Sequence, residues 1–123
     1  MTKSSVKAIL GYTIIDGITL GEYDHWLWKI HYPDLLANPY LERIVLNTVA
    51  RPITSTSAGT DSSNEQLSLE RIAELHFADH EAYEMYLQWF DEHPIPVERS
   101  PAGRTNFRFY VLCDVQETDR TSR

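Results

Sequence analysis

The sequence predicts an α+β domain with the element order β-α-β-β-α-β, in which two helices cover one face of an antiparallel sheet. Three observations support this prediction. The chain has 123 residues, which is the size of one domain, with a structured core expected over about residues 6–115. Apolar residues make up 42% of the chain, which is enough for a packed core. Two segments show helical periodicity, and they alternate with four segments rich in β-branched and apolar residues.

The first strand and the first helix are predicted from the N-terminal third of the chain. Residues 6–15 (VKAILGYTII) are almost continuously apolar, as in a strand covered on both faces. Thr19 and Glu22 fit the capping box, so a helix should begin at about Thr19. Pro33 is expected to stop this helix, or to tighten it, near His31. Three apolar residues recur at helical spacing and should face the sheet: Tyr23, Leu27 and Ile30.

The central part of the chain predicts a hairpin. Residues 41–52 and 68–77 have the composition of strands. Residues 53–66, which lie between them, are rich in Ser, Thr and Gly and show no periodicity, so they are expected to form a long polar loop.

The C-terminal part predicts the second helix and the last strand. Asp79 is a suitable N-cap for a helix that Pro94 ends. A second long loop, residues 94–106, then leads into a strand over residues 107–115. The complete order of elements is that of the ferredoxin-like split βαβ fold.

The last strand is apolar on both sides, which predicts a partner subunit. Strict alternation places five apolar residues on one side: Phe107, Phe109, Val111, Cys113 and Val115. Tyr110 and Leu112 lie on the other side. Because the two helices can cover only one face of the sheet, we expect a homodimer that hides the second face.

Composition excludes several classes of partner and site. Eleven Lys and Arg against 18 Asp and Glu give a net charge of −7, which is unsuited to a nucleic-acid surface. No apolar run approaches the roughly 20 residues that cross a membrane, so no membrane partner is expected. The single cysteine, Cys113, excludes an internal disulfide and a cysteine-based zinc site. A cytoplasmic location is the simplest interpretation.

Histidines are the first candidates for chemistry at neutral pH. His76 and His80 are four residues apart, but one ends a strand and the other begins a helix, so we expect no metal site. His31 lies at the end of the first helix among large aromatic residues. Two interpretations remain open for His31: a half-buried histidine stabilised by the helix dipole, or a general acid/base at the mouth of an aromatic pocket.

A second group of candidate residues lies on the hairpin. Glu74 and His76 share one face of the third strand and can form an acid/base pair, in which the carboxylate orients the imidazole. The alternatives are a wet dimer interface, or a Glu74 paired with Arg43 or Arg51. Asn47 stands among apolar neighbours, where its amide can hold a substrate oxygen or only a backbone group.

Aromatic residues are expected to line a cavity between helices and sheet. The candidates for substrate binding are Tyr12, Trp26, Trp28 and Tyr83. The alternative is that these residues belong to the core. His25, His80 and His93 are expected at the surface or at helix caps.

Two segments resemble the EthD-like branch of the dimeric α+β barrel superfamily. The first is HYPDLL at residues 31–36, followed by PYLERI at residues 39–44. In that branch a helix ends in a histidine, which matches His31, and a proline-containing stretch leads into the second strand. The other segment is IAELHF at residues 72–77 with the helix that follows it. An aromatic residue commonly stands at the position of His76, so this chain departs from the pattern there.

The resemblance implies a cofactor-free homodimer with a cavity between sheet and helices. Members and relatives include muconolactone-type isomerases, decarboxylases of aromatic polyketide pathways, polyketide cyclases and cofactor-independent monooxygenases. We therefore expect acid/base chemistry (cyclisation, isomerisation, dehydration or decarboxylation) on a hydrophobic aromatic or polyketide-like carbonyl compound, with His31 as acid/base. One alternative is a cofactor-independent monooxygenase of a phenol. Another is a dimer that binds a small molecule without catalysis.

Overall fold

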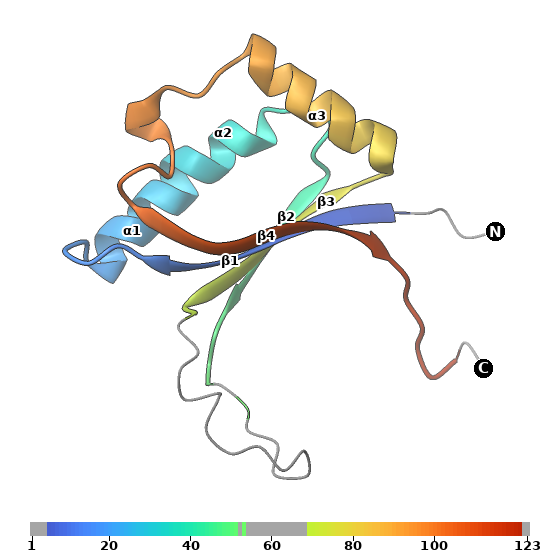
Figure 1. Cartoon of the computed structure of the whole chain (residues 1–123), viewed down its shortest axis with the longest axis horizontal. Helices are drawn as coiled ribbons and strands as arrows, with labels where there is room; N and C mark the ends of the chain where they lie inside the picture. Colours follow the sequence, from blue (N-terminus) through green and yellow to red (C-terminus); the bar gives the residue numbers. More distant parts are fainter. Residues whose placement is uncertain (1–4, 52, 54–68, 122–123) are drawn as a thin grey trace.

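The computed structural model describes residues 5–51, 53 and 69–121 of the chain. The elements, in order, are β1 (Ser5–Ile14), α1 (Leu20–Trp26), η1 (Leu27–His31), α2 (Tyr32–Leu36), β2 (Arg43–Thr48), β3 (Arg71–Phe77), α3 (His80–Glu92), η4 (Val97–Arg99) and β4 (Thr105–Val115). The strands form an antiparallel sheet in the order β2-β3-β1-β4. The helices lie together on one face of this sheet (Figure 1). The α+β, ferredoxin-like fold predicted from the sequence is confirmed.

The two predicted helix starts are confirmed. The Thr19 hydroxyl accepts a hydrogen bond from the backbone N–H of Glu22 at 3.1 Å, and the Glu22 carboxylate accepts one from the Thr19 N–H at 3.0 Å. These reciprocal bonds satisfy two donors that the first helical turn leaves without intrahelical partners. At α3, the Asp79 carboxylate accepts from the N–H of Ala82 at 2.8 Å. Local side-chain chemistry therefore sets where both helices begin.

The predicted effect of Pro33 is wrong. The helix neither stops nor tightens at this proline: it widens into a π turn over Leu27–His31 and continues as α2 to Leu36. The backbone N–H of Tyr32 bonds to the carbonyl of Leu27, five residues earlier. Pro33 lies inside this continuous helix, where its missing N–H removes one backbone hydrogen bond and its ring would clash with the carbonyl of Lys29 in a regular α-helix. The π turn adds one residue and allows the helix to pass the proline.

Several strand boundaries differ from the prediction: β1 spans Ser5–Ile14 rather than 6–15, β2 ends at Thr48 rather than at residue 52, and β3 begins at Arg71 rather than at residue 68. β2 begins at Arg43 rather than at residue 41, because the Leu41 side chain turns into the core and is 6% exposed. β4 begins at Thr105, two residues before the predicted start. The predicted pairing of the two hairpin strands is confirmed by an antiparallel register in which Val45 lies opposite Glu74. Most of the predicted loop at 53–66 lies outside the described residues.

A bulge changes the face on which Phe107 lies. The register between β1 and β4 shifts between Gly11 and Tyr12, which pair with Phe109 and Phe107 respectively. Arg108 is therefore the extra residue, and strict alternation fails at this point. Phe107 packs edge-on against Tyr12, with ring centroids 6.1 Å apart, on the side of the helices. The prediction that Phe107 shares a face with Phe109 is thus wrong.

The sheet has one covered face and one open face. The helices pack on the face that carries Ala8, Leu10 and Leu75, all of which are buried. The open face carries apolar residues of β4 without cover from the described residues, including Phe109 at 37% and Val111 at 47% exposure.

None of the helices in the described part of the chain has the length and apolar character of a membrane span.

Candidate functional site

A cavity of about 360 Å³ lies between the covered face of the sheet and the helices. Its walls come from β1, β3 and β4, from the helical segment 20–36, from α3, and from the loop that precedes β4. The lining is mostly aliphatic and aromatic, with a few polar atoms from histidine, tyrosine, serine and threonine side chains. This combination is typical of sites that bind small apolar molecules and orient them through a few polar groups.

His31 lies in the wall of this cavity. Its ring stacks on Trp26, with centroids 4.6 Å apart and planes 13° apart, and it is tilted against Tyr32. The Nδ1 atom is buried and has no hydrogen-bond partner among the described residues. The π turn ends at His31, so the ring is held at a fixed point of a rigid helix.

The surroundings of His31 favour its neutral form. Burial lowers the pKa of the imidazole from 6.5 to about 4; the carboxylate of Asp34 opposes this shift, and the guanidinium of Arg104 adds to it. At neutral pH only about one ring in a thousand is then protonated. A neutral imidazole with an unpaired nitrogen can accept a proton or a hydrogen bond from a ligand.

Tyrosine side chains bring hydroxyl groups to the cavity. The hydroxyls of Tyr12 and Tyr32 are buried and have no hydrogen-bond partner of good geometry within the described part of the chain. They nevertheless lie close enough to influence each other's pKa. Tyr23 differs, because its hydroxyl bonds to the Thr105 hydroxyl at 2.7 Å. Burial raises the pKa of all three tyrosines, so they remain protonated at neutral pH.

An ion pair lies beside the tyrosines. Arg71, the first residue of β3, is 5% exposed and donates to both carboxylate oxygens of Asp24 at 2.9 and 3.3 Å. A buried guanidinium needs such a partner. The pair connects the sheet to α1, and the positive charge of Arg71 acts to lower the pKa of Tyr12 and Tyr32, although burial outweighs it.

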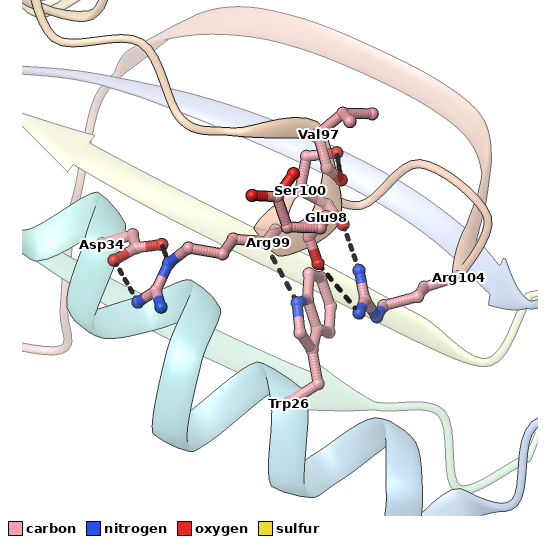
Figure 2. A network of polar contacts seen from close by, with 7 residues as sticks. All are labelled: Trp26, Asp34, Val97, Glu98, Arg99, Ser100 and Arg104. Carbon is pink, nitrogen blue, oxygen red and sulfur yellow. Dashed lines mark hydrogen bonds and ion pairs between the residues drawn. The ribbon is translucent and has the colours of Figure 1, made fainter.

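The loop before β4 forms one wall of the cavity. Figure 2 shows the polar contacts that join this loop to the helix. The indole N–H of Trp26 donates to the carbonyl of Arg99 at 3.0 Å. Arg99 also donates twice to the carboxylate of Asp34, at 2.8 Å each. Arg104 donates to backbone carbonyls of the same loop, and its guanidinium lies 4.9 Å from the Trp26 ring. The contacts that Trp26, Asp34 and Arg104 make thus hold the loop against the helix.

The structure brings some of the predicted aromatic residues to the cavity and places others elsewhere. Tyr12 and Trp26 line it, beside His31. Trp28 is 53% exposed and packs edge-on against Tyr32 on the outside of the helix. Tyr83 packs on Phe77 and is not among the residues that line the cavity.

The predicted hairpin group lies on the open face of the sheet, opposite the cavity. Glu74 and His76 form the expected pair, with the carboxylate 2.9 Å from Nε2. Lys7 and Asn47 donate to the same carboxylate at 3.2 and 3.1 Å. These contacts act to lower the pKa of Glu74. The sheet separates this group from His31, so the two predicted acid/base sites do not meet.

The remaining histidines have structural positions, as expected. His25 is exposed on α1, and His80 is exposed at the start of α3, 2.6 Å from the carboxylate of Asp114. His93 caps the end of α3 and stacks on Trp89. Within the described ranges, no three metal-ligating side chains come together.

Sequence analysis did not identify Tyr32 or Arg71 as site residues. Tyr32 lies next to His31 in the segment singled out for its resemblance, but the π turn that turns it inward has no simple sequence signal. Along β3, every second side chain points to the same face, so Arg71 lies on the covered face with Ala73 and Leu75. An arginine at a core position needs a buried carboxylate, and this requirement could have indicated the pair with Asp24.

Comparison with solved structures finds the same fold in proteins of low sequence identity. A cofactor-independent oxygenase, SnoaB, from Streptomyces nogalater has a TM-score of 0.58 and 13% identity, over 94% of this chain and 96% of the other. A hydroxynitrile lyase from Passiflora edulis has a TM-score of 0.59 and 12% identity, over 96% and 99%. A dimeric protein of unknown function with a ferredoxin-like fold from Bacteroides fragilis has 0.50 and 12%, over 92% and 96%. No protein-family model and no curated protein matches the chain.

Proposed function

We propose that the protein is a cofactor-independent enzyme that performs acid/base chemistry on a hydrophobic aromatic or polyketide-like carbonyl compound. The reaction class is cyclisation, isomerisation, dehydration or decarboxylation, and His31 is the acid/base. The observation that carries this proposal is the neutral imidazole of His31, with an unpaired buried nitrogen, in the wall of a mostly apolar cavity. The resemblance of residues 31–36 to the EthD-like pattern also supports placement in that branch, although the helix of this chain continues past His31 to Leu36.

The size of the cavity limits the substrate. An apolar cavity of about 150 Å³ can hold benzene. The cavity of about 360 Å³ is therefore suited to roughly two fused rings with small substituents. Larger polyketides would need part of the molecule to extend out of the cavity.

The proton-transfer step follows from the charges around His31. The neutral imidazole removes a proton from the carbon next to a carbonyl group, and the electron pair moves to the carbonyl oxygen. The resulting imidazolium lies beside the new enolate, which raises its pKa from the low value in the free protein. Return of the proton to a different carbon of a conjugated enolate completes an isomerisation without any redox partner.

The structural neighbours are compatible with this chemistry. One is described as a cofactor-independent oxygenase and another as a hydroxynitrile lyase. At identities of 12–13% this likeness shows the fold, and the chemistry proposed for this chain relies on its own cavity.

Hydrogen–deuterium exchange tests the proposal without knowledge of the natural substrate. We suggest 2-tetralone, a ketone with two fused rings, in D₂O, with exchange next to the carbonyl followed by NMR. The protein should accelerate exchange above buffer, and His31→Gln should lose about 10²- to 10⁴-fold of that acceleration. His25→Gln, on the exposed part of α1, is the matched control and should keep the full rate. Equal rates for the His31 variant and the parent would exclude His31 as the base.

A monooxygenase acting on a phenol is the second candidate, favoured by the likeness to the oxygenase SnoaB. Uptake of O₂ in proportion to phenol consumed, without added cofactor, would support it over the first. A dimer that only binds a small molecule is the third. This third candidate predicts that a bound phenol or ketone is recovered unchanged, and that neither the parent protein nor His31→Gln shows turnover.

We further propose that the open face of the sheet is the contact surface of a homodimer. Its apolar residues include Phe109 and Val111, and one structural neighbour is a dimeric protein. Glu74 and His76 lie on the same face, which favours their interpretation as interface residues over a second catalytic pair. Sedimentation equilibrium should show a dimer that Val111→Lys dissociates, and a parent chain that sediments as a monomer would overturn this proposal.

A further inference from the structure

We propose that Tyr12 and Tyr32 form a two-donor site for the substrate oxygen, and that this oxygen carries negative charge during the reaction, as in an enolate or a phenolate. The inference rests on the proposed function, because it concerns the same cavity. It adds the substrate class: a compound of about two rings with a carbonyl or phenolic oxygen that becomes anionic. His31 acts on the carbon or oxygen, and the two tyrosines hold the charge that forms.

The first argument is that both hydroxyls are buried without an acceptor. Tyr12 is 2% exposed and Tyr32 is 5% exposed, and both residues line the cavity. Neither hydroxyl oxygen has a hydrogen-bond partner of good geometry among the described residues, although the two hydroxyls lie close enough to each other to interact. Buried polar groups in folded proteins are nearly always paired, because an unpaired group loses its bonds to water without replacement. Two unpaired donors at one cavity therefore indicate that a ligand supplies the acceptor.

The second argument is the contrast with Tyr23. This side chain lines the same cavity and packs against Tyr12, with ring centroids 6.1 Å apart. Its hydroxyl, however, is paired with the Thr105 hydroxyl at 2.7 Å. The fold therefore provides an internal partner for one of three neighbouring tyrosines and leaves two free to bond to a substrate.

The third argument concerns protonation. Burial raises the pKa of Tyr32 to about 12 and also raises that of Tyr12; Tyr32 disfavours ionisation of Tyr12, whereas hydrogen bonding from Tyr12 favours ionisation of Tyr32 without outweighing burial. Both hydroxyls thus keep their protons and can act only as donors toward an anion. Burial moves the pKa of His31 in the opposite direction, so the same cavity holds a proton acceptor and two donors. Such a separation of pKa values within one site is how acid and base roles are assigned.

The fourth argument is the charge beside the tyrosines. The Arg71 guanidinium, held by Asp24 at 2.9 Å, acts to lower the pKa of both Tyr12 and Tyr32, whereas the Asp24 carboxylate acts to raise that of Tyr32. A positive charge at this position strengthens hydrogen bonds to an anionic oxygen. A neutral ligand oxygen would gain less from this arrangement, which favours an oxygen whose charge grows during the reaction.

Stability measurements test whether the hydroxyls are unpaired in the free protein. Tyr12→Phe and Tyr32→Phe remove an unpaired buried group and keep the ring, so they should leave the midpoint of urea unfolding unchanged or raise it. Tyr23→Phe is the matched control: it breaks the bond to Thr105 and should lower the midpoint. A loss for Tyr12→Phe and Tyr32→Phe as large as the loss for Tyr23→Phe would show that both hydroxyls already have partners, and would overturn the inference.

Binding of 2-naphthol tests the charge on the ligand. This phenol has two fused rings, and its absorption spectrum distinguishes the neutral form from the anion. The parent protein should bind the anion preferentially. Each of Tyr12→Phe and Tyr32→Phe should weaken anion binding by about 10- to 100-fold, with a much smaller effect on the neutral form. Tyr83→Phe, which lies outside the cavity lining, should bind as the parent does.

The outcomes separate this inference from the proposed function. Failure of the proposed function appears as the absence of catalysed exchange in 2-tetralone. Failure of the present inference appears as naphtholate binding that neither tyrosine variant changes, or as no binding of 2-naphthol to the parent protein. Anion binding that depends on both hydroxyls, together with unimpaired stability of both variants, supports the two-donor site.

Discussion

Acidification provides a direct test of the buried, neutral state of His31. Burial lowers its pKa from 6.5 to about 4, so the unfolded chain binds the proton more tightly than the folded protein between these values. The stabilising contribution of the neutral ring is fully present above pH 6.5 and is lost as the pH falls towards 4. Because a tenfold change in proton affinity corresponds to about 1.4 kcal/mol, the total loss is about 3 kcal/mol.

The assay is urea unfolding at a series of pH values and a fixed protein concentration, for the parent and for His31→Gln. The free energy of unfolding of the parent should fall more steeply than that of the variant, by up to about 1.4 kcal/mol per pH unit. Asp34 and Glu74 also have lowered pKa values, but as carboxyl groups they contribute at lower pH and in both proteins. If the difference between the two proteins does not change with pH, His31 is not held neutral by burial and the proposed base is refuted.

The remaining predictions concern packing and polar contacts elsewhere in the fold. Arg71→Met should lower the free energy of unfolding by about 2–3 kcal/mol, because it leaves Asp24 without its partner; unchanged urea unfolding would contradict this. Asn38→Ala should cost about 3 kcal/mol in the same assay, since the fully buried amide makes two hydrogen bonds to backbone groups that would lose their partner. In Gly11→Ala the new Cβ overlaps the ring of Phe109, so self-association measured by sedimentation should weaken about tenfold, and an unchanged dimer would place the contact elsewhere.

Local signals in the sequence were sufficient for most of the fold. The capping box at Thr19 and the N-cap at Asp79 are interactions within four residues, and short-range chemistry decides them. Alternation along β3 correctly placed Leu75 and Glu74 on opposite faces of the sheet. These predictions hold because hydrogen-bonding capacity and side-chain period act before any tertiary contact forms.

The features that were missed depend on contacts between distant segments. The bulge that turns Phe107 inward follows from how β4 pairs with Gly11 and Tyr12, almost a hundred residues earlier in the chain. The pairing of Arg71 with Asp24 likewise requires α1 to lie over the start of β3. The predicted role of Glu74 and His76 depended on which face of the sheet carries the cavity, and single-strand alternation does not contain that information.

The π turn explains how the candidate site is assembled. A regular helix that buries Tyr23 and Leu27 would bring residues 30 and 34 to the sheet next. One extra residue in the turn shifts this phase, and the structure buries Tyr32 and Leu35 instead. The tyrosine thus reaches the wall that also carries His31, opposite Tyr12 on β1. Such turns occur frequently at functional sites because they give up regular hydrogen bonding for the placement of a side chain. The same distortion that allows the helix to pass Pro33 therefore places the proposed base and one of the proposed donors at a single cavity.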